Sequence, residues 1–115
     1  MKRRLKFETG MDISVTIEVD YDVLTPEMAT EMVSFWSGGD EVLDASDGDV
    51  FVAAARFAAA NLMRFLIDGY NADGAIRELC KGEGWPEKEM LGMSIVDSDI
   101  PDFDPAYLEL DELHA

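Results

Sequence analysis

The chain has 115 residues, of which 48% are hydrophobic, and this size and composition are typical of one globular domain. Its 9 Lys and Arg face 25 Asp and Glu, which gives a formal net charge of −16. Such a charge argues against direct binding of nucleic acid and against an anionic membrane surface, because both need a basic protein surface. A basic protein is the complementary partner, and the alternative is that acidity only keeps a small protein soluble.

The start of the chain is basic, although no apolar stretch follows that would predict a signal peptide. Four of the nine bases lie there: Lys2, Arg3, Arg4 and Lys6. Cys80 is the single cysteine, and a lone thiol suits a reducing compartment. The longest apolar stretch, residues 50–67, contains two arginines and an asparagine and does not predict a membrane span. We expect a cytoplasmic protein, located in the cytosol of a bacterial host.

Two strands and a helix are predicted first along the chain. Residues 4–8 form a short strand, and residues 13–20 alternate apolar and polar side chains, the period of a strand with one buried face. The intervening residues 9–12 predict a hairpin turn. Thr25 and Pro26 then suit the N-cap and first position of a helix, which Gly38 and Gly39 can end.

The middle of the chain holds an acidic stretch and a long apolar helix. Residues 40–49 carry five acids and no base and predict a loop, in which Ser46 and Asp49 resemble a capping box. Residues 49–68 predict a helix that is apolar over most of its circumference and contains a run of alanines. Such a helix is central to a core, or it also forms a homodimer interface.

The remaining elements complete an α+β domain. We expect a shorter helix at 73–81, a turn or short helical segment at 85–91 and a third strand at 92–97. The order β-β-α-α-α-β predicts a three-stranded, mainly antiparallel sheet with helices packed on one face. Residues 1–97 form this single domain in our prediction. Residues 98–115 form an acidic C-terminal segment, which either docks on the domain or contacts a partner.

The sequence does not predict an enzyme, a metal site or a cofactor. The only histidine, His114, lies one residue from the end, where chains usually fray, so it is a poor catalytic base. Acid pairs arise by chance among 25 carboxylates, and no glycine-rich phosphate motif is present. The spacing around Gly48 fails that of a calcium loop, and one cysteine with one terminal histidine excludes zinc. A carboxylate-based hydrolase or a metal-dependent enzyme stays a minor alternative.

Two acidic clusters supply the candidate partner-binding residues. The first is Asp40, Glu41, Asp44, Asp47 and Asp49, of which the last two also suit the N-terminal end of a helix dipole. The second interleaves acids with apolar side chains near the C-terminus: Asp97, Asp99, Asp102, Asp104, Glu109, Asp111 and Glu112. Aromatic anchors inside a charged rim are common at protein interfaces, and the predicted anchors are Trp36, Phe103 and Tyr107.

Five segments together carry a resemblance to a known family. They are residues 23–30 (VLTPEMAT), 35–38 (FWSG), 47–50 (DGDV), 83–86 (EGWP) and 100–104 (IPDFD). As a set they resemble a small uncharacterised family of bacteria and phages, domain of unknown function 2528. The resemblance covers most of the chain and brings no catalytic motif. It implies a phage or prophage context, in which small acidic proteins without enzyme motifs often inhibit host defence, anti-CRISPR proteins among them.

The sequence therefore predicts an acidic, phage-type protein that binds and inhibits a host nucleic-acid-binding defence protein, of the CRISPR or restriction type. DNA mimicry is a candidate mechanism, because a duplex carries one negative charge per roughly 1.7 Å of axis and the charge of this chain is of a comparable density. The alternative is a homodimeric structural or assembly domain whose acidity has no inhibitory role.

Overall fold

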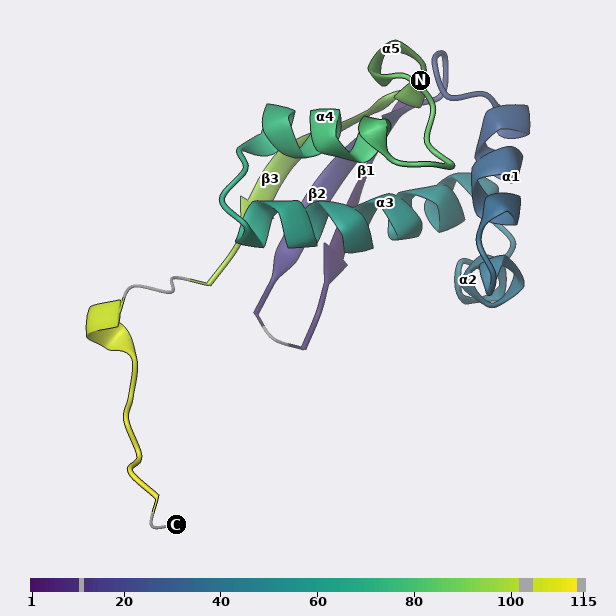
Figure 1. The fold of residues 1–115 in the computed structure, drawn as a ribbon. Coiled ribbons are helices and arrows are strands. Elements are labelled where there is room, and N and C mark those ends of the chain that lie inside the picture. The colour runs from purple at the N-terminus through teal and green to yellow at the C-terminus, as the bar shows by residue number, and fades with distance from the viewer. Residues whose placement is uncertain (11, 102–104, 114–115) are drawn as a thin grey trace.

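Three antiparallel strands form one sheet in the computed structural model, which describes residues 1–10, 12–101 and 105–113. The strands β1 (Lys2–Glu8), β2 (Ser14–Asp20) and β3 (Met93–Asp99) lie in the order β1-β2-β3 (Figure 1). Register pairs Leu5 with Ile17, and Ile17 with Ile95. The β2–β3 register shifts between Thr16 and Ile17, whose partners on β3 are Asp97 and Ile95.

The helices lie on one side of this sheet. They are α1 (Pro26–Phe35), α2 (Gly39–Ala45), α3 (Val50–Ile67), α4 (Ala72–Lys81) and α5 (Lys88–Leu91), and η1 (Pro105–Tyr107) follows β3. Figure 1 shows α3 and α4 lying across one face of the sheet, while α1 and α2 pack against the N-terminal half of α3, beyond the β1 edge. The predicted α+β class, with its three-stranded antiparallel sheet and helices on one face, is confirmed.

The core fills the space between the sheet and α3. Val15, Ile17 and Val19 point inward from β2 and are fully buried, as the period of two predicts. The alanines of α3 at 53–55 and 58–59 are also buried within this one chain, so their small side chains let α3 lie close to its neighbours. The alanine-rich face is therefore not free to form the seam of a homodimer.

Helix α3 is long and apolar enough, by length and composition alone, to cross a membrane. In this fold it contacts α1, α2, α4, β1 and β2. Polar positions such as Arg56 and Arg64 form its exposed stripe. These contacts are those of the central helix of a domain core.

Two local predictions in the acidic stretch are wrong. Residues 40–49 are not simply a loop, because Gly39–Ala45 form α2, which turns Val42 and Leu43 toward the domain. Ser46 is not the N-cap of the next helix: it follows the end of α2 and its hydroxyl donates to the Val42 carbonyl at 2.8 Å. Asp49 itself caps α3, so a single-residue cap replaces the predicted capping box.

The third strand ends later than predicted, and the chain after it includes exposed residues. Strand β3 continues past residue 97 to Asp99, and Ile100 still packs against the core. Residues 105–113 extend away from the sheet in Figure 1, and Leu108, Leu110 and Leu113 are exposed. The apolar side chains of this described part thus contribute nothing to the core.

Candidate partner-binding site: an acidic cleft between α1 and α2

Most of the first acidic cluster lies on and just after α2. Asp40, Glu41 and Asp44 are exposed on this helix, and Asp47 is exposed in the turn that follows. None of these four carboxylates forms an ion pair with a described residue. These four carboxylates are therefore exposed to solvent and not held in an ion pair with a described residue.

Two glycines fix the direction of α2 relative to α1. Gly38 has φ 85°, in the left-handed region that glycine adopts without steric cost. A Cβ on Gly39 would collide with the backbone carbonyl of Val33, so only glycine allows α2 to pack this closely on α1. Arg56 of α3 donates to the Ala45 carbonyl at 3.3 Å and holds the other end of α2.

An open cavity of about 570 Å³ lies between α1, α2 and the start of α3. We call it the acidic cleft; its side chains include Thr30, Val33, Trp36, Asp40, Glu41 and Val50. Two carboxylates thus stand beside an apolar and aromatic lining. Lys and Arg side chains suit such a site, because their stems pack on apolar surface while the charged head pairs with a carboxylate.

Asp49 belongs to the same stretch of sequence but has a structural role. Its carboxylate accepts from the backbone N–H groups of Phe51 and Val52 at 3.0 and 3.2 Å, and it pairs with Arg3 at 2.9 Å. Burial opposes ionisation of this carboxyl, but the hydrogen bond from Arg3 and those from the backbone outweigh it and lower its pKa. Asp49 therefore joins the first strand to α3.

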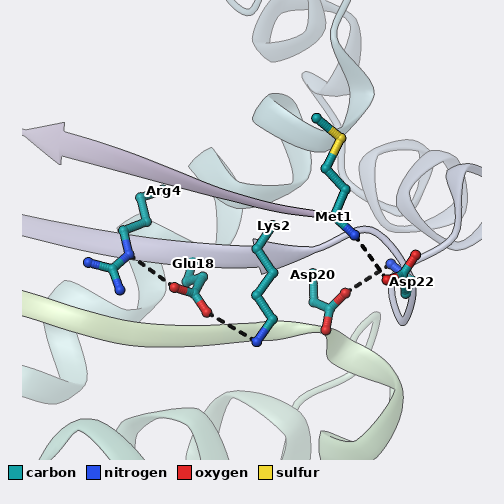
Figure 2. A network of polar contacts seen from close by, with 6 residues as sticks. All are labelled: Met1, Lys2, Arg4, Glu18, Asp20 and Asp22. Atoms are coloured by element: carbon teal, nitrogen blue, oxygen red, sulfur yellow. Dashed lines mark hydrogen bonds and ion pairs between the residues drawn. The ribbon is translucent and has the colours of Figure 1, made fainter.

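Acids on the outer face of the sheet are paired in a similar way. Figure 2 shows Glu18 of β2 between Lys2 and Arg4 of β1, at 3.7 and 3.0 Å. The N-terminal amine pairs with Asp22 at 2.9 Å, and the Asp22 backbone N–H donates to Asp20 at the same distance. Most basic side chains at the start of the chain thus form ion pairs with acids of the sheet or with Asp49.

The second acidic cluster lies elsewhere. Asp97 and Asp99 are exposed on β3, on the far side of the molecule from α2 (Figure 1). Glu109, Asp111 and Glu112 are exposed in the C-terminal segment. Asp102, Phe103 and Asp104 lie outside the described residues; Tyr107 ends η1, but its side chain is not described. The structure does not bring the described residues of the two clusters together.

Trp36 is not the exposed anchor that we predicted. It is half-buried, and its indole N–H is buried without a hydrogen-bond partner among the described residues. Its ring lies 4.8 Å from Phe35, edge to face, and 6.0 Å from both Phe57 and Trp85. Trp36 is thus the centre of an aromatic cluster whose exposed member is Phe35.

Residues 14–109 match the model of a family described as Protein of unknown function (DUF2528). The chain belongs to this family. The match runs from β2 through η1 and confirms the predicted resemblance. No curated protein and no solved structure shows significant similarity to the chain.

Two segments that carry this family resemblance meet in the structure. Residues 35–38 contribute Phe35 and Trp36, and residues 83–86 contribute Gly84 and Trp85. A Cβ on Gly84 would meet the Phe35 ring, and Trp36 and Trp85 lie 6.0 Å apart. Sequence reasoning missed Phe35 and Trp85 as candidate site residues, because only the fold brings their two segments together.

The described part of the chain gives little support for metal binding or for a reactive cysteine. No group of three His, Cys, Asp or Glu residues there is placed to hold a metal ion. Burial raises the pKa of the Cys80 thiol, and the charge of Glu89 raises it further, which lowers the fraction of reactive thiolate. The expectation that the protein is not an enzyme stays a prediction.

Proposed function

We propose that this protein binds a basic protein surface of the kind that normally holds nucleic acid, and that the acids around the acidic cleft make the contact. In the phage context that the family resemblance implies, the partner is a host defence protein in the bacterial cytosol, such as a CRISPR effector or a restriction enzyme. Binding would inhibit this partner by occupying its nucleic-acid site.

The observation that carries the proposal is the group of carboxylates on and after α2. Asp40, Glu41, Asp44 and Asp47 are exposed and have no ion pair with any described residue. Asp40 and Asp44, four residues apart in one helix, repel each other and weaken that helix slightly. A basic partner would remove this repulsion and gain electrostatic steering, which raises the association rate.

In this proposal the protein imitates the charge of nucleic acid at one place on its surface, around the acidic cleft. Helix α2 and strand β3 lie on opposite sides of the fold in Figure 1, so one groove of a partner meets either the acids of α2 or the described acids of β3, rather than a continuous row of charges. The α2 cluster is the better candidate, because it adjoins a cleft and an aromatic cluster. The second cluster adds to the negative electrostatic field that attracts a basic partner over longer distances.

Affinity capture with matched baits tests this function. The charge variant Asp40→Asn/Glu41→Gln/Asp44→Asn removes three carboxylates near the cleft. The control Asp68→Asn/Asp73→Asn/Glu87→Gln removes three exposed carboxylates elsewhere and has the same net charge. We expect the wild type and the control to retain one bacterial partner at low salt and the charge variant to lose it.

Displacement of nucleic acid from the recovered partner is the decisive readout. The partner is loaded with labelled DNA or RNA, and the protein is titrated in. Competition by the wild type, weakened in the charge variant, supports the proposal. A ternary complex that keeps its nucleic acid, or equal weakening in both triple variants, contradicts it, because net charge alone would then explain the effect.

A further inference from the structure

Phe35 forms an exposed ridge between two cavities next to the acidic cleft. Its side chain is 50% exposed at the C-terminal end of α1. The first cavity, about 300 Å³, is lined by Met28, Glu31, Met32, Phe35, Trp85 and Pro86, besides Gly84. The second, about 250 Å³, has Phe35, Trp36, Phe65, Glu78, Glu83 and Trp85 among its lining residues. We call this surface the Phe35 groove.

Packing holds the ridge in place. Trp36 contacts the Phe35 ring edge to face at 4.8 Å. Gly84 has φ 87° and lies against the same ring so closely that a Cβ there would collide with it. A large aromatic side chain that is fixed on two sides and still half exposed is the kind of rigid apolar surface that binding sites use.

The charges around the groove select the occupant. No Lys or Arg is among the residues lining either cavity, whereas three glutamates are. Glu78 pairs with Lys81 at 3.1 Å, which leaves Glu31 and Glu83 without an ion pair to a described residue. The complement of this groove is therefore a segment with both apolar and cationic side chains.

The C-terminal segment of a second copy of this chain does not fit that description. Its exposed apolar side chains at the C-terminal end are Leu108, Leu110 and Leu113. Glu109, Asp111 and Glu112 lie between them, so the segment would bring negative charge to a negative rim. Like charges placed face to face across an interface disfavour binding.

We propose that the Phe35 groove docks a cationic segment of the partner protein, whose apolar side chains fill the cavities on both sides of Phe35 while its Lys or Arg side chains face Glu31 and Glu83. This inference rests on the proposed function, because it describes the same partner. Trp36 lines both the acidic cleft and the groove, so the two form one continuous surface. Binding then has a salt-sensitive component from the carboxylates of α2 and of the groove, and a salt-resistant component from the apolar contacts around Phe35.

Tryptophan fluorescence reports directly on this site, because the chain has only two tryptophans and both line the groove. Three synthetic peptides serve as probes: alternating Arg and Leu, alternating Arg and Ser, and alternating Glu and Leu. We expect saturable emission changes with the Arg–Leu peptide, binding at least about tenfold weaker for Arg–Ser, and no response to Glu–Leu. Equal binding of Arg–Ser and Arg–Leu, or no response to Arg–Leu, overturns the inference.

Variants localise the response. Phe35→Ser removes the ridge and is expected to weaken Arg–Leu binding about tenfold. The control Met90→Ser changes a side chain of equal exposure, 49%, that lines neither cavity, and is expected to bind as the wild type does. The variant Glu31→Lys/Glu83→Lys keeps the apolar lining, and its peptide preference should change from Arg–Leu to Glu–Leu. This gain of Glu–Leu binding tests the inference even if Phe35→Ser fails to fold. Wild-type binding by Phe35→Ser, or an unchanged preference in the charge-reversed variant, contradicts the inference.

Failure of this inference and failure of the proposed function give different results. If only the groove inference is wrong, the charge variant of α2 still loses the captured partner, while Phe35→Ser retains it over the same range of salt concentrations as the wild type. If only the proposed function is wrong, the Arg–Leu peptide still binds at the groove, but the captured partner keeps its nucleic acid.

Discussion

On the outer face of the sheet, Glu18 lies between Lys2 and Arg4, whereas at the α1–α2 end Asp40, Glu41 and Asp44 form no ion pair with a described residue. The same type of side chain is neutralised in one region and left free in the other. The difference shows that a net charge of −16 does not act uniformly over the surface. The bases of the first strand pair with acids of the sheet and with Asp49, so none of them pairs with the acids of α2.

The largest expected effect comes from disturbing the junction that positions α2. Gly39→Ala places a methyl group against the Val33 carbonyl, so α1 and α2 must move apart. We expect a loss of about 1–3 kcal/mol in the free energy of unfolding, measured by urea denaturation. Gly10→Ala is the control, since a Cβ there meets nothing within 4 Å. Similar losses in both variants would show that α2 is not fixed by this contact.

The contrast between paired and unpaired acids also exists within the first acidic cluster, between Asp49 and Asp44. Asp49→Ala removes the N-cap of α3 and the ion pair with Arg3, and we expect it to cost about 1–2 kcal/mol of stability. Asp44→Ala removes the same charge from an exposed position without an ion pair and is expected to stay within about 0.5 kcal/mol of the wild type. Equal losses would contradict the separation of structural from free acids.

Because the pKa of Asp49 is lowered in the folded state, its contribution to the free energy of unfolding depends on pH. A carboxyl whose pKa is lower in the folded state contributes stability that is present above its unfolded value, near 3.8. This contribution disappears as the pH falls from that value through the folded pKa. The difference in unfolding free energy between wild type and Asp49→Asn should therefore shrink below about pH 4. A constant difference down to pH 2 would show that Asp49 stabilises the fold by other means.

The smallest effect is expected on the outer face of the sheet. Glu18→Gln breaks the ion pairs with Lys2 and Arg4, whose side chains are mostly exposed to solvent. Pairs of this kind contribute about 0.2–1 kcal/mol each and are screened by salt. We expect a total loss below about 1 kcal/mol that decreases at high salt, as measured by denaturation at two ionic strengths. A larger, salt-independent loss would make this network part of the core stability.

Regular elements were predictable because their patterns are local. The alternation in 13–20 identified β2, and Thr25 with Pro26 identified the start of α1, whose N-cap Thr25 accepts from the Met28 N–H at 3.2 Å. Helix α2 escaped prediction because its sequence, GDEVLDA, begins with glycine and shows too few apolar residues for a period. Its stability comes from packing against α1 and α3, which a single sequence does not display.

The candidate site was only partly predictable for a similar reason. Acids at 40, 41, 44 and 47 were identified by composition, but their separation from Asp49 depends on the position of Arg3 in space. The groove depends on Trp36 and Trp85, which are distant in sequence and 6.0 Å apart in the fold. Phe35 and Trp36 are neighbours in the chain and point in different directions, so one is exposed and the other forms the centre of the aromatic cluster.

The most direct test of the account is a map of where the captured partner touches this protein. The protein is 12.8 kDa, small enough for backbone amide NMR of the isotope-labelled chain with and without the unlabelled partner. The account predicts that signals of residues 36–48 and 82–86 shift or broaden, while those of Lys2, Arg4 and Glu18 on the outer face of the sheet stay unchanged. A footprint on that outer face, with α2 and the Phe35 groove unaffected, would contradict it.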